Sequence, residues 1–165
     1  MDYVPAIARW VHFMAGVMWI GLLYYFNFVQ VAALKAAAAD GTAAGITKHV
    51  APRALLFFRW AAVVTWLAGA WLLGRDFLTA FLFQDKAFVP IGVGAWLGTI
   101  MLFNVWVLIW PNQKKILGIV SASDEEKNKA RRVAFLASRA NVMLSMPMLF
   151  FMAGGMSHRG VFFGM

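Results

Sequence analysis

Apolar residues in this chain gather into four long runs that are separated by more polar connections. The runs cover residues 7–31, 55–73, 90–110 and 133–156. Crossing the hydrocarbon core of a bilayer takes about 20 helical residues, so each run is long enough for a transmembrane helix. The connections are too short to separate two domains. The pattern therefore predicts an all-α protein, an integral membrane four-helix bundle in which residues 1–165 form a single membrane domain.

The composition favours the same fold class. Residues of the AVILMFWYC set make up 62% of the chain, whereas about 45–50% is usual for soluble domains on a set that also counts Gly. The formal charge is +8, but the basic residues lie between the apolar runs, which argues against nucleic-acid binding. The sequence contains no cysteine, so disulfides and a cysteine-attached haem within this chain are excluded.

Lysine and arginine are distributed unevenly over the connections. The first and third connections hold nine of them, whereas the termini and the second connection hold four. Because positive residues remain on the cytoplasmic side, both termini are expected outside, in the periplasm of a bacterium. The first run is too long for a signal peptide and is expected to be retained. The expected location is the bacterial inner membrane, as a multi-pass protein.

One face of the first run carries His12, Gly16 and Trp19 at helical spacing. Ionisable residues inside a membrane are costly and are therefore functional candidates. An imidazole beside small residues suits haem b, because the glycine leaves room for the macrocycle. We predict that His12 ligates haem iron, with His158 as the candidate second ligand and Gly16 and Trp19 beside the cofactor. A five-coordinate iron, a methionine ligand from the fourth run, or a His12 that only bonds a facing helix are the alternatives.

A second polar group is expected at the opposite, inner end of the bundle. It combines cations with hydrogen-bond donors, which suits a planar anion, haem propionates or a quinone head group. In the alternative, the arginines extend to the lipid headgroups and the asparagines bond across helices. The candidate substrate-binding or anion-binding residues are Asn27, His49, Arg59, Asn104, Asn112, Gln113, Lys114, Arg139 and Asn141.

The end of the fourth run carries a row of methionines. Met148, Met152 and Met156 share one helical face and are followed by His158. Thioether and imidazole ligands suit Cu(I), although methionine also fills gaps in apolar helices without any metal. Copper is therefore the alternative cofactor, and copper handling by a membrane protein is an alternative function.

Three strings carry a resemblance to a known family. They are HFMAGVMWIGLLYYF from His12, WPNQK from Trp110 and SRAN from Ser138. These strings resemble the N-terminal membrane domain of the bacterial cytochrome c-linked urate oxidases, also called urate hydroxylases. More remotely, the His12 to Trp19 spacing and the string TWLAGAWL from Thr65 are similar to the HemJ-type protoporphyrinogen oxidases. In that second family a first-helix histidine is a haem ligand, and the resemblance places this role on His12.

The sequence departs from both families. The urate oxidases have a longer membrane part and a C-terminal c-type haem domain, for which this sequence has no cysteine. The third-span lysine of the HemJ-type enzymes is missing, and Asn104 is the nearest polar residue.

These departures limit what the resemblance implies about function. We predict a b-haem-binding membrane redox protein that acts as an oxidase or as an electron-transfer subunit. Its expected partners are the lipid bilayer and other membrane subunits or a cytochrome c-type electron acceptor. The alternative is a non-catalytic accessory membrane subunit of a larger respiratory complex.

Overall fold

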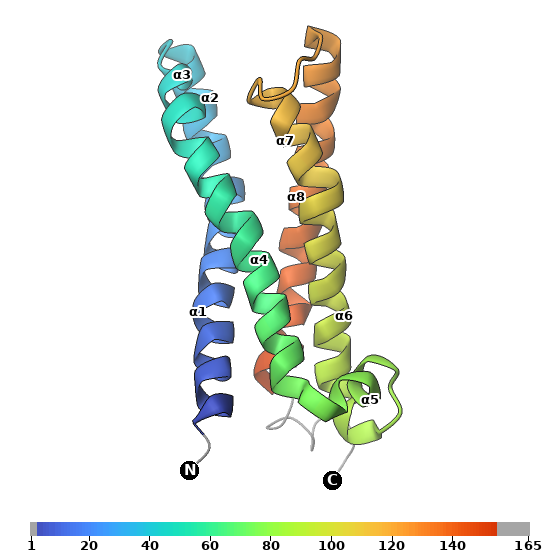
Figure 1. The fold of residues 1–165 in the computed structure, drawn as a ribbon. Helices are drawn as coiled ribbons and strands as arrows, with labels where there is room; N and C mark the ends of the chain where they lie inside the picture. The colour runs from blue at the N-terminus through green and yellow to red at the C-terminus, as the bar shows by residue number, and fades with distance from the viewer. Residues whose placement is uncertain (1–2, 155–165) are drawn as a thin grey trace.

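Four long helical stretches run side by side through the computed structural model, which describes residues 3–154 (Figure 1). All four are long and apolar enough to cross a membrane, and the described part of the chain contains no strand. The predicted fold class is therefore confirmed. The stretches are Val4–Ala39, Ala43–Phe81, Lys86–Ile116 and Asp124–Ala153.

The first three stretches change helix type along their length. The first consists of α1 (Val4–Tyr24), the π-helical η1 (Tyr25–Gln30) and α2 (Val31–Ala39). The second consists of α3 (Ala43–Gly45), the π-helical η2 (Ile46–Val50), α4 (Ala51–Leu73), the 3₁₀ turn η3 (Gly74–Asp76) and α5 (Phe77–Phe81). The third consists of the 3₁₀ turn η4 (Lys86–Phe88), α6 (Val89–Phe103), the π-helical η5 (Asn104–Ile109) and α7 (Trp110–Ile116). The fourth is α8 (Asp124–Gly154).

The helix ends follow from local sequence signals. Gly41 ends the first stretch with a φ of +73°, a conformation that glycine adopts without steric cost. Before α8, the backbone N–H of Ser123 donates to the Glu126 carboxylate over 2.9 Å, and the Glu126 N–H donates to Ser123 Oγ over 3.2 Å. This reciprocal capping box satisfies backbone donors at the start of the helix. The charge-rich segment after Ser123 therefore begins α8 as its first turns.

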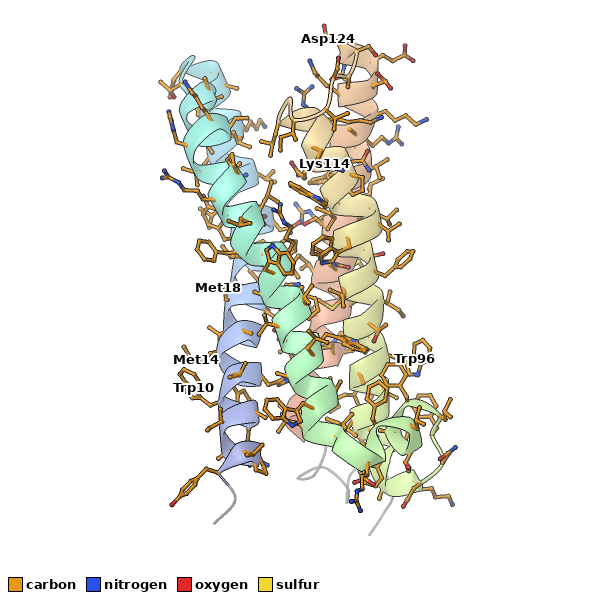
Figure 2. The ribbon with its side chains drawn as sticks, in the orientation of Figure 1. Trp10, Met14, Met18, Trp96, Lys114 and Asp124 are labelled. Atoms are coloured by element: carbon orange, nitrogen blue, oxygen red, sulfur yellow. The ribbon has the colours of Figure 1, made fainter. Side chains whose placement is uncertain are left out.

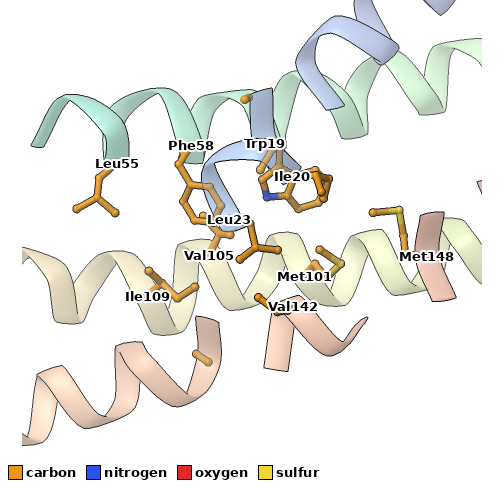
Figure 3. Packing of buried hydrophobic residues seen from close by; sticks show 13 residues of the cluster. Trp19, Ile20, Leu23, Leu55, Phe58, Met101, Val105, Ile109, Val142 and Met148 are labelled. Carbon is orange, nitrogen blue, oxygen red and sulfur yellow. The ribbon is translucent and has the colours of Figure 1, made fainter. Parts of the chain in front are cut away.

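The helices pack as two antiparallel pairs. α1 lies along α4, and α6 with η5 and α7 lies along α8, while contacts between α4 and α6 and between α1 and α8 join the pairs. Figure 3 shows the core where they meet, with apolar side chains from every long stretch. Representative core residues are Trp19, Phe58, Met101, Val105 and Val142.

Large apolar side chains also cover the outside of the bundle. Val17 is 70% exposed and Met143 is 73% exposed, and Figure 2 shows Trp10, Met14 and Met18 along the outer edge of α1. Such a surface is unfavourable in water but suits lipid tails, and helices satisfy the backbone hydrogen bonds that lipid cannot. The structure is therefore that of a multi-pass membrane protein.

The orientation of this bundle in the membrane is open to a direct test. α1 begins and α8 ends at the same end of the bundle, the end that also carries α5 (Figure 1). We expect a compartment reporter fused after Met165 to be active in the periplasm and one inserted at Gly118, between α7 and α8, to be active in the cytoplasm. A cytoplasmic signal from the Met165 fusion would reverse the predicted orientation.

Candidate functional site

The imidazole of His12 on α1 is bonded to α4. Its Nδ1 lies 2.8 Å from the carbonyl oxygen of Thr65. Because a carbonyl oxygen only accepts, Nδ1 carries the proton and donates, and Nε2 of the neutral ring retains its lone pair. Metal-bound histidines are commonly held in this way, with the second ring nitrogen fixed by a carbonyl or carboxylate. The His12 ring is thus oriented with Nε2 as its potential ligand atom.

Two glycines near His12 have different surroundings. A Cβ on Gly69 would lie 2.9 Å from Cε1 and 3.1 Å from Nδ1 of His12, so only glycine leaves room for the ring. A Cβ on Gly16 would lie 3.7 Å from Cγ2 of Thr65, which is an ordinary contact. The close approach of α1 and α4 at His12 therefore depends on Gly69, and Gly16 faces Thr65.

The remaining predicted cofactor residues fall in different places. Trp19 is 2% exposed, and its indole Nε1 has no hydrogen-bond partner among the described residues. His158 lies outside the described residues. Within residues 3–154 no group of three or more His, Cys, Asp or Glu side chains could hold a metal ion, but haem iron needs only one or two protein ligands.

The methionine row is engaged in packing where it is described. Met148 belongs to the buried core, and Sδ of Met152 lies 3.3 Å from the position of a Cβ on Gly94. Met156, like His158, lies outside the described residues. Both described thioethers therefore already have an apolar packing role between α8 and its neighbours.

Three predicted asparagines lie inside the bundle and connect its helices. Asn104 Nδ2 donates to Asn141 Oδ1 over 2.8 Å, and Asn141 Nδ2 donates to the Met101 carbonyl over 3.0 Å. Asn27 Nδ2 donates to Ser138 Oγ over 2.7 Å and to the Leu23 carbonyl over 2.8 Å.

The asparagine bonds fall where the helix type changes. Leu23 and Met101 are close to the starts of η1 and η5, where π-helical turns alter the backbone ladder. The Asn27 and Asn141 amides supply hydrogen bonds to these two carbonyls. The three asparagines thus satisfy polar backbone and side-chain groups inside the bundle.

Removing this interior bonding should lower stability. Asn141→Leu deletes two hydrogen bonds and leaves the Asn104 amide unpaired, so we expect a loss of about 1–2 kcal/mol in unfolding free energy. Asn112→Leu is the matched control, because among the described residues the Asn112 side chain bonds only the Leu108 carbonyl of its own stretch. Thermal unfolding in detergent measures the loss of stability in both variants. Equal destabilisation by the two would show that the interhelical bonds of Asn141 contribute no more than the local bond of Asn112.

Two predicted cations each lie near the ring of one tryptophan, Trp110. Cζ of Arg59 lies 3.7 Å from the ring centroid of Trp110, and Nζ of Lys114 lies 6.0 Å from the centroid of the same ring. Neither cation forms an ion pair or a side-chain hydrogen bond within the described chain, whereas Lys115 lies 3.5 Å from a Glu126 carboxylate oxygen. Arg59 and Lys114 therefore retain free donors for an anion.

The other candidates of the predicted inner group lie elsewhere. Arg139 is exposed on α8 over Phe135 of the same helix, at 5.1 Å from the ring centroid, and no described contact joins it to Arg59. His49 is exposed in η2. Asn112 and Gln113 are half-buried in α7. The predicted single group is thus divided into interior asparagines, two cations near Trp110, two half-buried residues of α7 and the exposed His49 and Arg139.

Several residues that build these sites were missed by sequence reasoning. From the sequence alone, Thr65 and Gly69 were given no part in the contact with His12. Their spacing of one helical turn inside an apolar run is nevertheless typical of a close helix contact. Tyr24 was also missed, and its hydroxyl oxygen lies 3.0 Å from that of Ser145 on α8. Their alignment becomes apparent only once α1 and α8 are known to be neighbours.

Comparison with known proteins identifies one family. The model of the family described as Urate oxidase N-terminal matches residues 74–164, which is more than half of the chain. No curated protein and no solved structure matches. The matched segment contains Asn104, Lys114, Arg139 and Asn141, whereas His12 precedes it.

Proposed function

The chain belongs to the urate oxidase N-terminal family, and from that premise we propose that it is a membrane redox domain that holds haem b through His12. The observation that carries this proposal is the 2.8 Å bond from His12 Nδ1 to the Thr65 carbonyl. It leaves Nε2 as the free ligand atom on a ring that Gly69 allows to lie against α4. His12 is therefore a residue that would hold haem iron through Nε2.

Each residue around His12 has a distinct part in this proposal. Haem b would supply a one-electron couple there, and the proposed partner is an acceptor such as a cytochrome c. The Thr65 carbonyl fixes the tautomer of His12 and makes the imidazole a stronger donor. The Thr65 hydroxyl donates to the Ala61 carbonyl over 2.7 Å, so it is already engaged within α4. His158 is proposed as the second residue that would bind the iron.

A substrate for an oxidase of this kind would reach the bundle from the end opposite His12. Asn27 follows His12 by 15 positions in the sequence, which corresponds to roughly 22 Å at 1.5 Å per helical residue. The two groups therefore lie in different halves of a bilayer about 30 Å thick. We place the haem in the half that holds the start of α1 and any substrate contacts in the half that holds α7.

A second candidate function is supported by the asparagine network. Asn27, Asn104 and Asn141 find their partners within the bundle, as interhelical bonds in a purely structural subunit would. On this reading the chain is a non-catalytic accessory subunit of a larger respiratory complex. It differs from the leading proposal because it requires no cofactor at His12.

Absorption spectra and metal analysis of the purified protein separate the candidate functions. A Soret band whose position shifts on reduction is expected for the haem-binding redox domain. Protein that contains neither haem nor copper after expression with sufficient haem supply would favour the accessory subunit. Copper without haem would instead favour the methionine row as a metal site and would contradict the proposal.

A further inference from the structure

An apolar groove of about 390 Å³ lies on the outside of the bundle between α4 and the third stretch. It is open on its lipid-facing side, and apart from one threonine its walls are apolar. The residues that line it are Val63, Thr99, Leu102, Phe103, Trp106 and Val107.

One tryptophan, Trp106, lines this groove, and a second, Trp66, bonds to the lining residue Thr99. At the end nearer α5, Trp66 Nε1 donates to Thr99 Oγ1 over 2.8 Å, which removes the polar group of Thr99 from the groove. At the other end, Trp106 is one helical turn before Trp110, the residue under the Arg59 guanidinium. Val63 is likewise one turn after Arg59 along α4. The groove and the Arg59 and Lys114 cations therefore lie on successive turns of the same two helical stretches.

The length of the groove and the two positive charges of Arg59 and Lys114 favour an amphiphilic ligand with one anionic end. Thr99 and Trp110 are 11 residues apart, which spans roughly 16 Å of helix and suits most of the length of a fatty acyl chain. Arg59 and Lys114 have no carboxylate partner in the described chain, so an anion would compensate both. Figure 2 shows Lys114 in the half of the bundle that holds Asp124, at the start of α8.

We propose that the groove is a binding site for an anionic phospholipid of the leaflet on the Lys114 side. The phosphate lies between Arg59 and Lys114 beside Trp110, and one acyl chain lies along the groove towards Thr99. The planar guanidinium can donate two parallel hydrogen bonds to phosphate oxygens, and its stacking on Trp110 holds it in place. A zwitterionic lipid is disfavoured, because its ammonium group would lie beside two cations. On this proposal Arg59 and Lys114 bind the phosphate of the lipid and not a redox substrate.

The test is lipid retention by the full chain. Protein in nanodiscs of equal phosphatidylglycerol and phosphatidylcholine is extracted into detergent, and native mass spectrometry counts the lipids that remain bound. We expect phosphatidylglycerol to be retained preferentially and the Arg59→Gln Lys114→Gln variant to bind it roughly 10- to 30-fold more weakly. Arg139→Gln is the matched control, since it removes a cation from an exposed site on α8 and should leave retention unchanged.

A second variant tests the groove without touching the charges. Val63→Phe places a larger side chain in the acyl path and should also reduce phosphatidylglycerol retention. Thermal unfolding in the absence of lipid verifies that each variant is folded. If the Arg59→Gln Lys114→Gln variant does not fold, the single variant Lys114→Gln is used in its place. Equal retention of phosphatidylcholine and phosphatidylglycerol by the unaltered protein would overturn the proposal. Equal loss in the Arg139→Gln control would overturn it as well.

Discussion

His12→Ala is expected to abolish haem binding while the bundle stays folded. The variant removes the imidazole whose Nε2 is left free by the 2.8 Å bond from Nδ1 to the Thr65 carbonyl. Because haem in a membrane bundle is held chiefly through its axial ligands, we expect the Soret band of the purified protein to disappear. Free imidazole added during reconstitution should restore part of the band, because it can occupy the space left by the side chain.

His158→Ala separates the two predicted ligands. If His158 completes the coordination, this variant should keep haem but change from a low-spin to a high-spin spectrum. An unaltered spectrum in His158→Ala would leave His12 as the essential ligand and remove His158 from the site. A haem spectrum unaltered in His12→Ala would contradict the ligand assignment itself.

Gly69→Ala should have the second-largest effect, although it adds only one methyl group. Alanine favours a helix by about 1 kcal/mol over glycine, so the backbone alone would gain stability. The new Cβ, however, would lie 2.9 Å from Cε1 of His12 and force the ring away from the Thr65 carbonyl. Loss of a bond that orients a metal ligand typically weakens metal binding by roughly 10- to 100-fold.

Gly98→Ala on α6 is the matched control for this variant. It makes the same chemical change away from His12, and apart from its chain neighbours and its own helix backbone no atom of the described residues lies within 4 Å of the position of its Cβ. Haem titration of the two purified variants measures the difference. Equal haem affinity in Gly69→Ala and the unaltered protein would show that the orientation of His12 by α4 is unimportant.

The four spans could be predicted from the sequence because lipid imposes a simple requirement on composition and length. Their extents could not, since the helices continue beyond the hydrocarbon core. α2 (Val31–Ala39) extends the first stretch because its alanine-rich sequence favours helix until the turn at Gly41. The short α5 (Phe77–Phe81) was also missed, because its few residues carry no periodic pattern.

The polar residues were easier to identify than to assign to a common site. Asn27, Asn104 and Asn141 were expected near one another at the inner end, and they do lie in the interior with bonds across helices. Arg59 and Arg139 have the same chemistry in the sequence, yet one lies on Trp110 and the other faces outwards over Phe135. Which side of a helix faces a neighbour depends on how the two pairs pack, and apolar periodicity is weak in helices that lipid surrounds.

The haem content of the purified chain tests the central claim most directly. The protein should be expressed with added haem precursor, purified in mild detergent, and analysed by the pyridine haemochrome method against the protein concentration. Because His12 supplies one ligand site in each chain, we expect a molar ratio of about one haem b per protein chain. Folded protein that contains no haem b under these conditions, and that takes up none on titration, would contradict it.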